Sequence, residues 1–214
     1  MDTHLLAGLI APPDRSERFY GVTVGIVTNN QDPDGLGRVK VRFPWLSDED
    51  ESHWARVATA MAGNRRGLFF LPEVDDEVLV AFEHGLVEFP YILGSLWNGK
   101  DAPPESNDDG RNNKRTIKSR SGHIIRLDDT AGGEKIEIVD KSGNNSVVIS
   151  TADNTIIISA DADITITSSG GKLRLNGDAV EIKAQTAITL EASTSMDLQA
   201  QGQMTIRGAT VNIN

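Results

Sequence analysis

Pairs of large aliphatic residues, separated by one position, recur through residues 125–213 of this 214-residue chain. The steps between successive pairs are 11, 11, 9, 8, 9, 7, 8, 8, 8 and 7 residues, so a period near eight begins at about Val147. Residues at i and i+2 share a face of a strand but not of a helix. We therefore predict that each repeat is a short strand with two inward side chains, a mostly polar residue between them that faces water, and a turn. The pairs, here called doublets, are Ile125/Leu127, Ile136/Ile138, Val147/Ile149, Ile156/Ile158, Ile164/Ile166, Leu173/Leu175, Val180/Ile182, Ile188/Leu190, Met196/Leu198, Met204/Ile206 and Val211/Ile213.

Two side chains per strand are too few to form a core in a single row of strands, because their burial offsets only part of the backbone entropy lost on folding. The strands must therefore stack around a shared apolar axis. A single chain could coil with three eight-residue repeats (octads) in each turn, or rung, of a column. Alternatively, three chains could intertwine so that each contributes one octad to every rung. The local pattern fits both. A single-chain column of about four rungs, at about 4.8 Å per rung, would leave its ends unprotected, so we favour the intertwined homotrimer.

The composition of the chain changes near its middle. All eleven aromatic residues lie at or before Trp97 and all eight prolines at or before Pro104. Residues 101–120 are polar, include prolines and have no apolar periodicity, which is typical of a linker. Before them, short period-two segments separated by turn formers predict a small antiparallel barrel. The segments expected to be strands are 22–26, 39–43, 54–58, 68–71, 78–82 and 91–96.

Charge and motif content argue against nucleic-acid binding, cofactors and catalysis. The net charge is −10, which repels phosphate backbones, and the absence of cysteine excludes disulfides and thiolate metal sites. The four histidines are scattered, without metal-binding spacing. Asp32 and Asp34 stand in a glycine-containing turn that lacks the other ligands of a calcium loop. Nothing in the sequence places a nucleophile, a base and an orienting group together with the paired carboxylates Asp128 and Asp129, so acid/base catalysis by them is not expected. We expect no metal, no cofactor and no enzymatic activity.

The apolar run 5–10 is too short for a secretory signal or a membrane span. No other run approaches about 18 apolar residues. We therefore expect the protein to be made and assembled in the cytoplasm.

Four ordered segments in the first half carry a family resemblance. They are DPDGLGRVKVRFPW, HWARVATAMAG, RRGLFFLPEVDDEVLVAFEHG and EFPYILGSLWNG. Together they resemble the barrel domain of the contractile-injection spike family, which includes phage baseplate assembly protein V and the type VI secretion protein VgrG. The resemblance covers about residues 20–100, and the octad tail extends it to residue 214. Members often have Gly-Asp where Asp75-Asp76 and Gly85-Leu86 stand here, so we expect those two turns to differ in shape.

The resemblance implies an all-β fold in which an oligonucleotide/oligosaccharide-binding (OB) barrel precedes an intertwined trimeric β-helix. The implied organisation is an N-terminal extension at 1–19, an OB domain at 20–100, a linker at 101–120 and the octad-repeat spike at 121–214. Spike proteins with a preceding hub domain are longer, so we expect the hub to be a separate protein that docks at the barrel end, where residues 5–10 would contribute.

The implied function is that of a non-enzymatic central spike, a rigid homotrimeric needle that contacts the target membrane transiently as it pierces the envelope. The particle would resemble a phage tail, and the spike would be ejected on contraction. We expect a PAAR-type tip protein to bind Val211, Asn212, Ile213 and Asn214. The expected trimer core comprises Ile156, Ile158, Ile164, Ile166, Leu173, Leu175, Val180, Ile182, Ile188, Leu190, Met196, Leu198, Met204 and Ile206.

Two other function classes remain open at this point. A single-chain β-helix enzyme acting on polysaccharide would be a monomer with a carbohydrate groove lined by aromatic and clustered charged residues, which the tail lacks. An OB nucleic-acid binder would need a basic barrel face with stacking aromatics, whereas residues 1–100 hold nine basic and fifteen acidic residues.

Overall fold

The computed structural model describes residues 18–46 and 49–213. The expected hub-docking stretch at 5–10 and the expected tip residue Asn214 lie outside these ranges. The chain divides into two compact units, residues 1–161 and 162–214. The described regular elements are strands and one short 3₁₀ turn, η2 (Glu83–Gly85), so the all-β class is confirmed.

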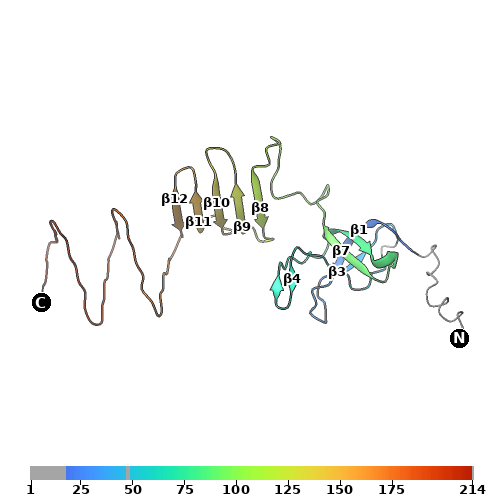
Figure 1. Cartoon of the computed structure of the whole chain (residues 1–214), viewed down its shortest axis with the longest axis horizontal. Coiled ribbons are helices and arrows are strands. Elements are labelled where there is room, and N and C mark those ends of the chain that lie inside the picture. The colour runs from blue at the N-terminus through green and yellow to red at the C-terminus, as the bar shows by residue number, and fades with distance from the viewer. Residues whose placement is uncertain (1–17, 47–48, 214) are drawn as a thin grey trace, which may run out of the picture. The chain divides into compact units, whose positions relative to one another are not determined.

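The first sheet of unit 1 has the strand order β2-β1-β6-β7-β3, and Figure 1 labels β1, β3 and β7. Its neighbours are antiparallel except for β3 and β7, which run parallel. Val39, just before β2, and Ala55, just before β3, exchange two backbone hydrogen bonds of 3.0 and 2.7 Å, which joins the two ends of the sheet. The strands are β1 (Val22–Asn29), β2 (Lys40–Arg42), β3 (Arg56–Val57), β6 (Glu77–Phe82) and β7 (Pro90–Ser95).

The core of this barrel follows the predicted period of two. Val39, Val41 and Phe43 alternate with exposed or half-buried residues, as do Val78 and Val80 on β6. Gly25 on β1 faces the same core, and a Cβ there would lie 3.1 Å from the Val80 side chain, so a larger residue would require its neighbours to shift. The buried hydrophobic residues are Val27, Val39, Val41, Phe43, Ala55, Val78, Val80, Phe82 and Ile92.

The strand expected at 68–71 is absent, and that prediction was wrong. A two-stranded hairpin, β4 (Ala62–Gly63) and β5 (Arg66–Gly67), precedes this segment instead. Arg65 adopts a φ of 55° within the hairpin turn. Phe69 is 79% exposed and Phe70 is 66% exposed, so the apolar run reflects surface side chains rather than a buried strand.

The two turns expected to differ from the family pattern both use the left-handed region. Asp75 has a φ of 76° and Gly85 a φ of 79°. Glycine adopts this conformation readily, whereas an L-residue such as Asp75 adopts it at a cost. The Asp76 carboxylate accepts a hydrogen bond from the Glu73 amide at 2.8 Å and braces the first turn.

The second sheet of unit 1 is an antiparallel meander in chain order (Figure 1). Left-handed glycines or asparagine stand in its turns, among them Gly122, Gly132, Gly143 and Asn154. The first of its strands lies within residues 101–120, the segment whose composition indicates a linker. The strands are β8 (Lys114–Lys118), β9 (Ile124–Asp128), β10 (Lys135–Val139), β11 (Ser146–Ser150) and β12 (Thr155–Ser159).

Residues 162–213, the described part of the second unit, form neither helix nor strand within the single chain. They make no backbone–backbone hydrogen bond, and every one of them is exposed. The change coincides with a change in the sequence period. The first three steps between successive doublets, of 11, 11 and 9 residues, are long enough for a five-residue strand and a hairpin turn. The steps after Ile156 are mostly seven or eight residues.

Candidate interaction surface

The first four doublets lie together on one face of the meander sheet. Ile136 on β10 is directly opposite Leu127 on β9 and Ile149 on β11, and Ile138 is opposite Ile125 and Val147. The same register continues to β12. Directly opposed residues in antiparallel strands share a face and contact one another. We call this surface the doublet face; it comprises Ile125, Leu127, Ile136, Ile138, Val147, Ile149, Ile156 and Ile158.

The doublet face is exposed in the single chain. Ile138 is 51% exposed and Ile156 is 70% exposed. A groove of about 520 Å³ runs over the face, lined by aliphatic side chains with His123, Asp140 and Asn145 at its margin. A contiguous apolar surface of this kind marks an interaction site. The two residues of each doublet therefore share one face, and within the chain that face has no cover.

The opposite face of the sheet carries the residues between the doublet positions. Thr116, Arg126, Glu137, Val148 and Ile157 lie in one row across β8–β12. The expected polar character holds for the first three and fails at the last two, where the chain places apolar residues instead. The polar part of this row forms a network that sequence reasoning missed.

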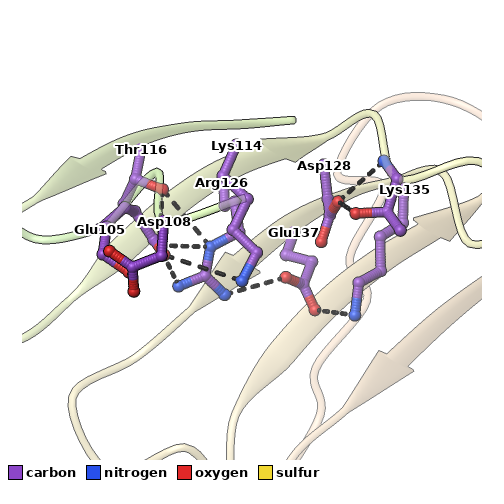
Figure 2. Close-up of polar contacts among 10 residues, drawn as sticks. Glu105, Asp108, Lys114, Thr116, Arg126, Asp128, Lys135 and Glu137 are labelled. Carbon is purple, nitrogen blue, oxygen red and sulfur yellow. Dashed lines mark hydrogen bonds and ion pairs between the residues drawn. The ribbon is translucent and has the colours of Figure 1, made fainter. Parts of the chain in front are cut away.

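Arg126 is the centre of that network (Figure 2). Its Nη2 donates to Glu105 Oε1 at 2.6 Å, and its Nη1 donates to Glu137 Oε2 at 3.3 Å. Thr116 Oγ1 also donates to Glu105 at 2.9 Å, and Lys135 Nζ lies 2.9 Å from Glu137 Oε1. The network ties β8, β9 and β10 together and fastens residue 105, in the segment expected to be a linker, to the sheet.

The network shifts the pKa values of its carboxyl groups. The hydrogen bond from Thr116 is the largest influence and lowers the pKa of Glu105; burial opposes it, and Arg126 adds to the lowering. Burial raises the pKa of Glu137, but the hydrogen bonds from Lys135 and Arg126 outweigh it, and the pKa falls below its ordinary value. Both groups are therefore held as carboxylates at neutral pH.

The remaining residues expected in the trimer core are not brought together by the single chain. Ile156 and Ile158 pair with Ile149 and Val147 on the doublet face. From Ile164 onward, the expected core side chains are between 48% and 67% exposed. Val211, Asn212 and Ile213 of the expected tip site are also exposed. Their assignment to a trimer core and a tip site remains a prediction.

Comparison with known proteins identifies the barrel. Residues 23–97 match the family model of the type VI secretion system/phage-baseplate injector OB domain. The barrel is therefore similar to the OB domain of this family. The expected resemblance to VgrG-like spikes is thereby confirmed, and the region matched coincides with the barrel strands β1–β7.

The proteins similar to this chain include two that are named as type VI secretion system spikes. The chain is 30% identical over 141 residues to VgrG3 of Vibrio cholerae, and the aligned region covers 62% of this chain and 14% of the relative. It is 32% identical over 127 residues to VgrG1a of Pseudomonas aeruginosa, and here the aligned region covers 54% of this chain and 20% of the relative. A third, 30% identical over 111 residues, is named actin cross-linking toxin VgrG1 of Vibrio cholerae; 48% of this chain and 10% of that protein are covered. The chain thus matches a small part of each relative's length.

The Arg38 guanidinium binds the acidic turn of the barrel. Asp32 accepts two hydrogen bonds from the Arg38 side chain, at 2.7 and 2.8 Å, and Asp34 accepts one at 2.6 Å. Asp32 also accepts the backbone amides of Asp34, Leu36 and Arg38. The side-chain hydrogen bond with Arg38 lowers the pKa of Asp32. Arg38 therefore neutralises the carboxylates, and the motif is a turn as expected.

The described ranges contain no group of three or more side chains placed to hold a metal ion. They also contain no helix long and apolar enough to cross a membrane. Asp128 and Asp129 make local contacts at the end of β9: Asp128 accepts hydrogen bonds from Thr130, and Asp129 forms an ion pair with Arg115 on β8.

Proposed function

We propose that the protein is the central spike of a contractile injection apparatus, in which three copies intertwine into a rigid needle. Its barrel matches the model of the injector OB domain, and two similar proteins are named as spike proteins, which supports a structural part in such an apparatus. The proposal includes cytoplasmic assembly into the baseplate of a phage tail-like particle, and ejection into the target envelope on contraction.

The uncovered doublets are the observation that carries this proposal. Eleven aliphatic doublets follow one another along the chain, and the described single chain covers none of them fully. Backbone groups also need partners, since unpaired N–H and C=O groups out of water are costly. Residues 162–213 have no backbone partner of their own. Identical copies supply both needs, because each offers strands of the same period and doublets of the same size.

Three copies around one axis account for the composition of the tail. A narrow triangular column admits aliphatic side chains inside and leaves the intervening residues outside. Residues 121–214 contain no aromatic residue and no proline, which suits a narrow interior and uninterrupted ladders. Bending such a column would break ladder hydrogen bonds in every copy at once. The resulting stiffness suits a part that is driven through an envelope and touches the membrane transiently.

The two ends of the needle would bind different proteins. We place a separate hub protein at the barrel end and a PAAR-type tip protein on Val211, Asn212, Ile213 and Asn214. Three open strand edges at the end of a column need a lid, which supports a tip protein there. Removal of residues 211–214 should abolish capture of such a tip protein while the trimer persists; unchanged capture would refute this assignment.

An image of the purified full-length protein tests the proposal. Negative-stain electron microscopy should show a thin needle projecting from a wider base. A compact particle without a needle would contradict the spike function. A chain truncated after residue 161 is the matched control, since it keeps unit 1 and removes the unpaired repeats; it should lose most of the needle's length.

A further inference from the structure

The doublet face contains a charged position that breaks the aliphatic rule. Arg115 on β8 lies directly opposite Leu127 on β9, and Ile117 lies opposite Ile125. Strand β8 therefore contributes Arg115 and Ile117 to the face on which β9–β12 each contribute two aliphatic residues. Within β8–β12, this is the one charged residue at a doublet position.

Arg115 is satisfied by its own chain. Its Nη1 donates to the Asp129 carboxylate just after β9, and the two side chains are 56% and 63% exposed. Strand β8 is one of the two edge strands of the meander and its first strand in the chain, so Arg115 lies at the first level of the doublet face. The ion pair is stable at this position as long as Arg115 stays exposed to solvent and close to Asp129.

The later repeats do not define how copies should align. The doublets from Ile164/Ile166 to Val211/Ile213 are all aliphatic and recur mostly every seven to nine residues. If one copy moves along another by one octad, nearly every doublet meets another doublet of similar size. Repetitive strands of this kind specify register weakly. Some other feature must therefore select one alignment of the copies.

We propose that Arg115 sets the register in which copies of this chain associate. The inference rests on the proposed intertwined trimer and names the residue that aligns it. In the aligned arrangement, the three Arg115 side chains lie at the same level, each beside its own Asp129 and close to water. A shift of one strand in either direction places Arg115 of one copy against an aliphatic doublet of the next. Burying an unpaired charge is strongly unfavourable, and a single polar residue in an apolar interface can fix register in this way.

Cysteine cross-linking in the full-length protein tests this inference, because the natural chain has no cysteine. Ile188→Cys and Met196→Cys mark inward positions of two successive doublets. Chains with either cysteine are given tags of different size, mixed unfolded, refolded together and oxidised. A 196–196 bond reports aligned copies, and a 188–196 bond between differently tagged chains reports a one-octad shift. The experiment is done with Arg115, with Arg115→Leu and with Arg115→Lys, which keeps the charge.

With Arg115 or Arg115→Lys, the bonds should join equal positions. With Arg115→Leu, the shifted 188–196 bond should increase at least about tenfold, while the trimer itself persists and melts at a higher temperature because a charge has left its apolar face. An unchanged cross-link pattern in Arg115→Leu, or loss of its trimer, would overturn the inference. A natural protein that is monomeric by mass would instead overturn the proposed function, so the two failures are distinguishable.

Discussion

Arg126 on β9 lies directly opposite Glu137 on β10, and its guanidinium donates to the Glu137 carboxylate at 3.3 Å. The same guanidinium binds Glu105, which stands nine residues before β8. Its Nε also lies 3.4 Å from Thr116 Oγ1 on β8, so one side chain contacts two neighbouring strands and the segment that leads into the sheet. The side chains of Arg126 and Glu137 are 24% and 13% exposed, so their contacts are partly shielded from solvent.

Arg126→Ala should destabilise the meander sheet. The substitution leaves Glu105 and Glu137 without their shared partner, and hydrogen bonds to charged groups contribute about 1.5–3 kcal/mol each. We expect a loss of about 2–4 kcal/mol in the free energy of unfolding, measured by chemical denaturation. Arg115→Ala is the control, because its ion pair is more exposed and should matter less to the fold of one chain. Equal losses in both variants would contradict this account of the network.

Acid should weaken the same sheet through its carboxylates. The pKa values of Glu105 and Glu137 lie below their ordinary value of 4.5, and hydrogen bonds from Ser142 and Asn145 lower the pKa of Asp140 from 3.8 to about 2. Groups with lowered pKa values stabilise the fold above the ordinary pKa, and this contribution is lost as the pH falls through the lowered values.

We therefore expect the melting temperature to be constant from about pH 7 to about pH 5 and to fall progressively below about pH 4.5. Glu137→Gln should lower the melting temperature at neutral pH and reduce the slope on the acid side. A slope that is the same in Glu137→Gln and the natural protein would show that this carboxylate is not among the groups responsible.

Ile164→Asp should abolish heat- and detergent-resistant trimers. Ile164 is an inward doublet residue in the proposed column, so the substitution places three unpaired carboxylates at one level of an apolar core. Thr165→Asp is the matched control, since the adjacent position should face water. Gel electrophoresis without boiling distinguishes the two. If both variants keep the trimer, or both lose it, the inward and outward assignment is wrong.

Asp32→Asn should destabilise the barrel without affecting the meander. The Asp32 carboxylate accepts three backbone amides and the Arg38 guanidinium, and its side chain is 3% exposed. An amide accepts fewer of these hydrogen bonds and carries no charge to pair with Arg38. Amide hydrogen exchange should become faster in β1 and β2 and remain unchanged in β9 and β10. Asp34→Asn, at a more exposed position, should have a smaller effect.

The sequence predicts the strands best where one face is buried and the other is not. Val39, Val41 and Phe43 alternate as expected and lie in the barrel core. The run at 68–71 misled because its apolar residues, Phe69 and Phe70 among them, are exposed, and hydropathy alone does not distinguish a surface patch from a strand. The parallel pairing of β3 with β7 could not be predicted either, because an alternation of apolar and polar residues does not indicate the direction in which neighbouring strands run.

In the repeats, the doublets predict facing but not pairing. The meander and the later octads share the same i, i+2 rule, and only the longer steps after Ile125 and Ile136 signal hairpins. Strand β8 was hidden because Arg115 replaces the first aliphatic residue of its doublet. The bond between Glu105 and Arg126 joins residues 21 positions apart, and no local pattern predicts such a contact.

The mass of the purified full-length protein in solution tests the central claim most directly. In the proposed needle, other copies of the chain cover the aliphatic face and pair with the repeats, and three copies of 23.1 kDa amount to about 69 kDa. Light scattering coupled to size-exclusion chromatography should give that mass at every concentration tested. A stable, fully folded species of 23.1 kDa would contradict the intertwined needle and the piercing role built on it.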